Sequence, residues 1–142
     1  MKISIGSDHR GFELKEKIIK AFENINWVDV GVNNSQSTDY PIYAKKVANL
    51  IKEKQVDLGI LICGSGVGMS IAANRFHGIY AALCWNEVVA KASKMDDNAN
   101  VLVLPADYID DELAIKIVKS WIEAKFKGEK YQKRLDMIDG EK

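Results

Sequence analysis

The stretch that most constrains this chain is residues 59–75, which read GILICGSGVGMSIAANR. An unbroken apolar run ends at Cys63, and three glycines then follow at alternate positions. This order predicts a buried strand, a tight turn and the start of a helix. Glycines let the backbone come close to a bound group, and the first free N–H groups of the helix point into the same space. Residues 64–68, called the glycine turn below, are therefore predicted to bind an anion.

The residues alone leave two interpretations of the glycine turn and of Cys63, one structural and one functional. Many crossover folds use glycine only to begin a helix, and a cysteine that ends an apolar strand is commonly a buried structural thiol. The functional alternative is a nucleophile or base, since the positive end of the helix dipole favours a thiolate. Met69 excludes three known loop motifs. At this position a dinucleotide-binding fingerprint requires glycine, a Walker loop requires lysine, and the phosphate loop of a cysteine-based phosphatase requires arginine.

Composition limits the class of protein. The 142 residues are 47% hydrophobic, which suits one domain over residues 1–142 with a substantial core. Lysine plus arginine equals aspartate plus glutamate at 20 each, so nothing favours nucleic acid or an acidic membrane as a partner. No apolar run approaches the roughly 18 residues of a membrane span.

Cysteine and histidine usage adds two expectations. Cys63 and Cys84 are predicted to end buried strands, and Met1 leads directly into the first strand without a signal peptide, so we expect a reduced, cytoplasmic protein. The two cysteines are not clustered with His9 and His77, so no metal site is expected.

Apolar segments alternate with amphipathic segments along the whole chain. The predicted strands are 2–6, 27–31, 57–63, 78–83 and 100–104. The predicted helices are 14–22, 42–54, 69–75, 87–94 and 110–126, and a last helix follows Gly128. Strict alternation favours an α/β fold: a doubly wound, five-stranded parallel sheet of order 2-1-3-4-5, with helices on both faces and an extra C-terminal helix.

This topology places a ligand site before any family is considered. Strands one and three flank the switch point, and ligands bind outside the carboxyl ends of such strands. The loop Asp8-His9-Arg10 should therefore face Cys63 and the glycine turn.

The last helix has an apolar stripe but no strand of its own, which predicts burial against a second subunit in a homodimer. On the same helix, Lys130 and Arg134 share a face with the preceding Lys127, either as a solvated surface or as a phosphate clamp.

Four motifs in order carry a resemblance to a known family. They are SDHRGFELK at 7–15, TDYPIYAKKVA at 38–48, residues 59–75, and NANVLVLP at 98–105. With them the whole chain resembles the sugar-phosphate isomerases of the ribose and galactose isomerase family. The resemblance implies interconversion of ribose 5-phosphate and ribulose 5-phosphate through an enediolate, in the non-oxidative pentose phosphate pathway and without metal or organic cofactor. The alternatives are another phosphorylated aldose, such as galactose 6-phosphate or allose 6-phosphate, and a sugar-phosphate-binding module without turnover.

The resemblance also implies roles for individual residues. Cys63 matches the family's base, and Ser65 a residue that bonds to sugar oxygens. Asp8 and His9 match residues that hold the ring oxygen and the phosphate end of the sugar. Tyr43 matches a residue near the mouth of the site, within reach of a neighbouring subunit. The anion hole is matched by Gly64, Ser65, Gly66, Val67 and Gly68. A homodimer or tetramer with the site at the subunit interface is the implied assembly.

The chain departs from the family pattern at three places. Asp96-Asp97 stands where relatives read His-Asn, the histidine being the residue that opens the sugar ring. Asp96 is the candidate to take over this proton transfer, with Asp97 near the substrate, and the alternatives are that His9 or solvent opens the ring. Asp107 stands where relatives often place a phosphate-binding arginine. Of the family's paired C-terminal arginines, Arg134 is kept and the other is replaced by Lys130, and Arg10 is the candidate to compensate for the lost guanidinium.

Overall fold

A central sheet of five parallel strands organises the computed structural model, which describes residues 1–140. The strands are β1 (Lys2–Ser7), β2 (Asn26–Gly31), β3 (Leu58–Cys63), β4 (Ala81–Leu83) and β5 (Val101–Pro105). Their order across the sheet is β2-β1-β3-β5-β4.

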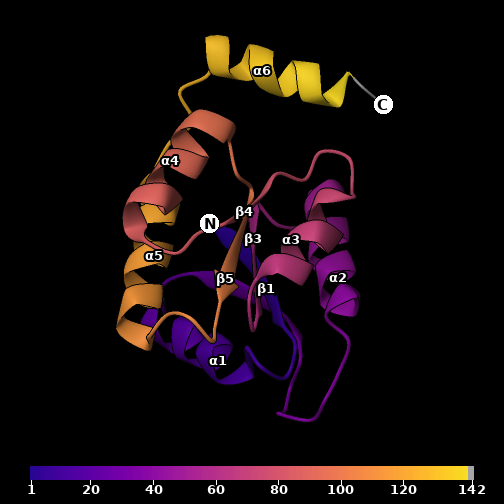
Figure 1. The fold of residues 1–142 in the computed structure, drawn as a ribbon, viewed down its shortest axis with the longest axis vertical. Coiled ribbons are helices and arrows are strands. Elements are labelled where there is room, and N and C mark those ends of the chain that lie inside the picture. Colours follow the sequence, from indigo (N-terminus) through magenta and orange to yellow (C-terminus); the bar gives the residue numbers. More distant parts are fainter. Residues whose placement is uncertain (141–142) are drawn as a thin grey trace.

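Helices cover both faces of this sheet. Within the described residues they are α1 (Phe12–Ala21), α2 (Tyr40–Lys52), α3 (Val67–Asn74), α4 (Glu87–Asp97), α5 (Asp111–Glu123) and α6 (Lys130–Asp139). Helices α1, α4 and α5 lie on one face, and α2 and α3 lie on the other (Figure 1). The predicted α/β class, the five parallel strands and the extra C-terminal helix are confirmed.

The predicted order of the last two strands is wrong. Strand β5 pairs with β3, and β4 lies at the edge, so the sheet ends 3-5-4 instead of 3-4-5. All five residues of β5 are buried, whereas the three residues of β4 are only half-buried. The fully buried strand takes the interior position, and the short strand takes the edge. The switch point between β1 and β3 is unaffected.

Strand β3 divides the core in two. Ile60 and Ile62 pack under α1, α4 and α5, and Leu61 and Cys63 pack under α2 and α3. Successive residues of a strand point to opposite faces, so an unbroken apolar run suits a strand buried on both sides.

Helix α5 shows how local sequence sets an element. The Asp110 side chain caps the helix by accepting a hydrogen bond from the Leu113 N–H at 2.8 Å. Near the other end Trp121 is fully buried, and its indole N–H donates to the Ala99 carbonyl at 3.1 Å. The cap fixes where α5 begins, and the tryptophan anchors its end to the start of β5.

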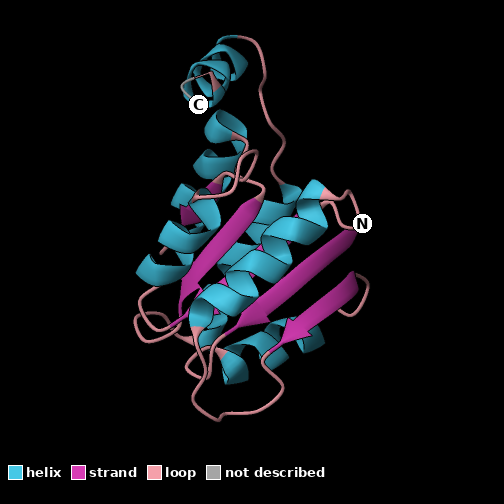
Figure 2. Cartoon of the chain, turned by 90° about the vertical axis from the view of Figure 1, so that its right-hand side faces the viewer, coloured by secondary structure: helices cyan, strands magenta, loops and turns pink. Residues whose placement is uncertain are grey.

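Helix α6 lies at the amino ends of the strands. Figure 2 shows the strand arrowheads pointing away from it. Leu135 is buried, and the Tyr80 hydroxyl, just before β4, donates to the Asp139 carboxylate. The Lys127 N–H donates to the Met95 carbonyl at 3.0 Å. These contacts hold α6 against the end of α4 and the start of β4.

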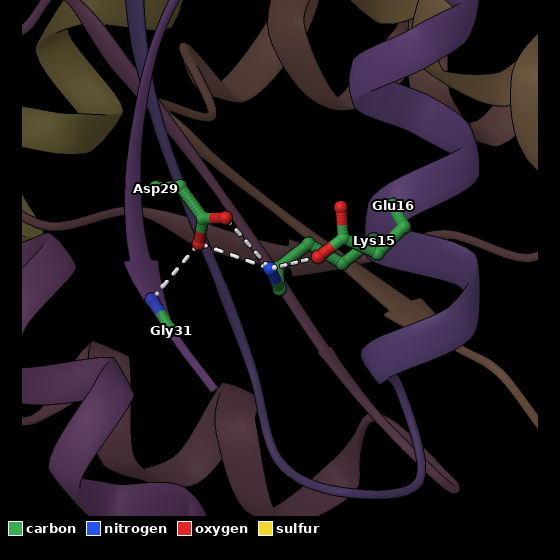
Figure 3. A network of polar contacts seen from close by, with 4 residues as sticks. All are labelled: Lys15, Glu16, Asp29 and Gly31. Carbon is green, nitrogen blue, oxygen red and sulfur yellow. Dashed lines mark hydrogen bonds and ion pairs between the residues drawn. The ribbon is translucent and has the colours of Figure 1, made fainter. Parts of the chain in front are cut away.

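A buried ion pair joins α1 to β2. Lys15 has no exposed side-chain area, and its Nζ lies 2.8 and 3.0 Å from the two carboxylate oxygens of Asp29 and 3.3 Å from Glu16 (Figure 3). Asp29 also accepts a hydrogen bond from the Gly31 N–H at 2.9 Å, where φ is +104°. The pair therefore fixes the turn that ends β2 and begins the segment 32–39.

No helix within residues 1–140 has both the length and the apolar character needed to cross a membrane.

Candidate functional site

Loops that leave β1, β3 and β5 meet at the switch point. The Asp8 N–H donates to the carbonyl of Ile62 at 3.2 Å, and the Ala106 N–H donates to the carbonyl of Cys63 at 2.9 Å. These bonds connect the loop after β1 and the loop after β5 to the end of β3. The topology-based expectation that Asp8-His9-Arg10 faces Cys63 therefore agrees with the arrangement found.

Cys63 ends β3 directly before the glycine turn. Its thiol is free, and the residue is 5% exposed. Gly66 caps α3 with φ +78°, and a Cβ there would lie 2.4 Å from the Cδ1 of Leu83. Only glycine fits both the backbone angle and the available space. Ser65 is exposed, and its Oγ accepts a hydrogen bond from the Val67 N–H at 3.2 Å.

The last glycine of the turn makes room for an aromatic ring. A Cβ on Gly68 would lie 2.7 Å from the Cζ of Tyr40, the first residue of α2. Tyr40 is 37% exposed. The ring therefore borders the glycine turn on the α2 side.

Asp8 shapes the loop after β1. It is 6% exposed, and its Oδ1 accepts hydrogen bonds from the backbone N–H groups of Arg10 at 3.0 Å and Gly11 at 3.2 Å. A Cβ on Gly11 would lie 2.8 Å from the carbonyl oxygen of Ile62, so glycine permits this close approach to β3. Asp8 thus holds the loop after β1 in place, and it does so with Oδ1, which accepts both hydrogen bonds.

His9 is oriented by the segment 32–39. Its Nδ1 accepts a hydrogen bond from the Thr38 N–H at 3.2 Å, which leaves Nε2 as the protonated nitrogen of a neutral ring. The Thr38 hydroxyl lies 3.0 Å from the hydroxyl of Tyr43. Tyr43 is 8% exposed and belongs to the same core cluster as Cys63.

Thr38 was missed by sequence reasoning as a site residue. It lies inside the quoted motif at 38–48, but a threonine before Asp39 and Tyr40-Pro41 looks like an ordinary residue ahead of a helix. Its contact with His9 depends on the path of the polar segment 32–39, which the sequence pattern does not specify.

Arg10 and Asp107 form an ion pair against the first glycine of the turn. Arg10 Nη2 donates to Asp107 Oδ2. A Cβ on Gly64 would lie 2.6 Å from the Cζ of Arg10 and 2.7 Å from that carboxylate oxygen. The two side chains therefore cover one side of the glycine turn.

Four further residues expected at the site lie elsewhere in the chain. Asp96 and Asp97 end α4, and Lys130 and Arg134 belong to α6, all at the amino edge of the sheet (Figure 1). A strand rises about 3.3 Å per residue, so the two edges are roughly 15–20 Å apart. Within one chain these four residues are not brought together with Cys63.

The amino edge has its own polar contacts. Asp96 pairs with Lys127 at 2.9 Å, and the hydrogen bond from Lys127 to Asp96 raises the pKa of the lysine. Asp97 lines a cavity of about 420 Å³ between α6 and the start of β4, together with Tyr80 and Asp139. Within residues 1–140, no three His, Cys, Asp or Glu side chains are grouped closely enough to hold a metal ion.

Comparison with known proteins gives consistent matches. The model of the Ribose/Galactose Isomerase family matches residues 3–138. Ribose-5-phosphate isomerase B of Escherichia coli is 42% identical, over 96% of this chain and 93% of that protein. A crystal structure of a ribose 5-phosphate isomerase from Thermotoga maritima matches with a TM-score of 0.96 and 46% identity, over 98% of this chain and 97% of that one. A crystal structure of ribose-5-phosphate isomerase B from Mycoplasma genitalium with bound ribulose-5-phosphate matches with a TM-score of 0.95 and 42% identity, over 99% and 95% of the two chains.

Proposed function

Because this chain belongs to the ribose/galactose isomerase family, we propose that it interconverts ribose 5-phosphate and ribulose 5-phosphate. The observation that carries the proposal is the free thiol of Cys63 at the end of β3, directly before the glycine turn and opposite the loop of Asp8 and His9. A base beside an anion site is what proton transfer next to a carbonyl requires.

Cys63 is the proposed base. Its thiolate takes the proton from C2 of the open-chain aldose to give an enediolate, and the resulting thiol, which can exchange its proton with solvent, then protonates C1. In the same conversion O1 gains a proton and the O2 hydroxyl loses one. A positioned acid or base typically contributes about 10²–10⁴-fold to the rate. The glycine turn would stabilise the enediolate oxygens, because the first N–H groups of a helix have no partner within it. Each such donor is worth about 2.7–4 kcal/mol in comparable sites.

The loop after β1 would hold the rest of the sugar. His9 has its Nε2 proton free for a substrate oxygen, since Nδ1 is occupied by Thr38. Asp8 keeps the loop in place through its bonds to backbone N–H groups. Ser65 is an exposed residue of the glycine turn, where its hydroxyl can reach sugar oxygens, and the Arg10 side chain lies next to Gly64.

We propose further that the complete site lies between two subunits of a homodimer or of a tetramer built from such dimers. Asp96, Asp97, Lys130 and Arg134 cannot reach Cys63 within one chain, and a two-fold axis would place the amino edge of one copy near the carboxyl edge of the other. The apolar side chains of Met137 and Ile138 on α6, and of Val67 and Ile71 on α3, are 51–63% exposed. Such exposed apolar surface on both elements supports contact with a second copy.

In this arrangement the partner's α6 would supply two positive charges for the phosphate, and Asp96 would assist ring opening. The family match over residues 3–138 supports one isomerase domain acting in the non-oxidative pentose phosphate pathway. Two free cysteines and a phosphorylated substrate favour the cytoplasm.

The first test is ketose formation from ribose 5-phosphate without added metal. We expect turnover by the wild type, its loss in Cys63→Ala, and its retention in Cys84→Ala, which removes the other buried thiol. Galactose 6-phosphate and allose 6-phosphate are assayed in parallel, because Asp96 replaces the family's histidine. Faster turnover of a hexose phosphate would change the assigned substrate, and binding of all three without turnover would favour a binding module.

Mixed subunits test the shared site. Cys63→Ala and Arg134→Ala proteins are each weakened, but a hybrid dimer contains one site with both native groups. Random mixing should therefore restore about a quarter of the wild-type activity. Mixtures that remain as inactive as their components would contradict a site shared between subunits.

A further inference from the structure

The ion pair between Arg10 and Asp107 lies where a substrate anion must approach. It joins residues 97 positions apart in the sequence, one from the loop after β1 and one from the loop after β5. The Arg10 side chain is 57% exposed and that of Asp107 is 34% exposed, so both can exchange partners with solutes.

The backbone on both sides of the pair is fixed. The Arg10 N–H donates to Asp8 Oδ1 at 3.0 Å, and the Asp107 N–H donates to the carbonyl of Gly64 at 2.9 Å. Gly64 directly follows Cys63 and touches both charged side chains, as the position of its missing Cβ shows. The pair is therefore held at the glycine turn by the main chain.

The charges of the pair compete with those of a phosphorylated substrate. A guanidinium group offers several N–H donors in a fork and binds either a carboxylate or a phosphate. While Asp107 occupies Arg10, it neutralises that cation and adds a negative charge that repels an incoming anion. An anion would therefore bind the Arg10 guanidinium only if it binds more strongly than the Asp107 carboxylate does.

We propose that Asp107 is a specificity-determining residue, and that the substrate's phosphate binds Arg10 by displacing the Asp107 carboxylate. A phosphate dianion is favoured in this exchange over a singly charged acid, because it carries more charge and more acceptor oxygens. The site would therefore discriminate against sugar acids, and its phosphate affinity would be lower than an unpaired arginine would give. The inference rests on the proposed site but not on turnover.

The test measures the binding of inorganic phosphate by titration calorimetry at constant ionic strength. Asp107→Asn keeps the side-chain shape and removes the charge, and we expect its dissociation constant for phosphate to fall about threefold to tenfold. The matched control is Asp111→Asn on α5, which removes the carboxylate of an exposed ion pair with Lys17 of α1. It changes the net charge equally, and its phosphate affinity should stay close to that of the wild type.

A second variant identifies the cation. Asp107→Asn combined with Arg10→Met should bind phosphate more weakly than Asp107→Asn alone, because the freed guanidinium is missing. Unchanged or weaker phosphate binding by Asp107→Asn would overturn the proposal, and so would equal binding by the single and double variants. Lack of isomerase activity would refute the proposed function without affecting this comparison, since phosphate binding needs no turnover.

Discussion

Removing either partner of the Lys15–Asp29 ion pair should destabilise the protein, and by unequal amounts. The Lys15 side chain is fully buried, whereas that of Asp29 is 32% exposed and that of Glu16 is 50% exposed (Figure 3). The two variants therefore leave different groups behind. Asp29→Asn leaves an enclosed ammonium with Glu16 as its remaining carboxylate partner, at 3.3 Å. Lys15→Met leaves a carboxylate that water can reach.

The magnitudes follow from this difference. Breaking a buried pair by removing one partner costs about 3–5 kcal/mol, and Asp29→Asn should fall in that range. In Lys15→Met, Asp29 keeps its hydrogen bond from the Gly31 N–H, and the expected loss is about 1–3 kcal/mol. The double variant leaves no unpaired charge from this pair, so it should be more stable than Asp29→Asn alone.

The assay is urea unfolding followed by circular dichroism. All variants are compared at one protein concentration, because assembly of subunits would add to the apparent stability. Lys17→Met on the same helix removes an exposed ion pair with Asp111 and should be close to neutral. The reasoning is refuted if Lys15→Met is as destabilising as Asp29→Asn, or if the double variant is less stable than Asp29→Asn.

Three further predictions concern a glycine, a thiol and a phenol. Gly66→Ala should lower the free energy of unfolding by about 2–4 kcal/mol in urea titrations, because φ is +78° and its Cβ would lie 2.4 Å from a leucine methyl carbon. Gly128→Ala, at φ +72° with nothing within 4 Å, should lose only about 1 kcal/mol. Burial raises the pKa of the Cys84 thiol, so at pH 8 iodoacetamide should label it much more slowly in the native protein than in urea; equal labelling by mass spectrometry would contradict this. Burial and the hydrogen bond with Asp139 raise the pKa of Tyr80 to about 12. Because the unfolded value is about 10, the stability from this group is present below pH 10 and is lost as the pH rises toward 12; Tyr80→Phe should flatten this slope in urea titrations at each pH.

The sequence pattern was sufficient for the architecture but not for the order of the last two strands. Residues 78–83 and 100–104 are both apolar, and periodicity does not say which one is buried on both faces. In the structure only Ala81–Leu83 pairs as a strand, because the chain turns before it, with the Ile79 N–H donating to the Phe76 carbonyl at 3.1 Å. A shorter, half-buried strand takes the edge.

The candidate site was predictable where it follows from topology. Parallel strands that flank a switch point must bring the loop of His9 to the end of β3, whatever the loop sequences are. The contact between His9 and Thr38 depends on the course of a polar segment, which has no periodic signal. The position of Arg134 depends on where α6 packs, which no local pattern specifies, whereas Asp96 lies at the amino edge because α4 runs back from the end of β4.

The central claim is that Cys63 transfers the proton between C2 and C1, and isotope exchange in D₂O tests it most directly. Ribose 5-phosphate is incubated with enzyme to equilibrium over many turnovers, and deuterium at C1 of the ketose is measured by NMR. We predict deuterium incorporation by the wild type and by Cys84→Ala, and loss of both ketose and exchange in Cys63→Ala while inorganic phosphate still binds. Ketose formation at the wild-type rate by Cys63→Ala would contradict the account.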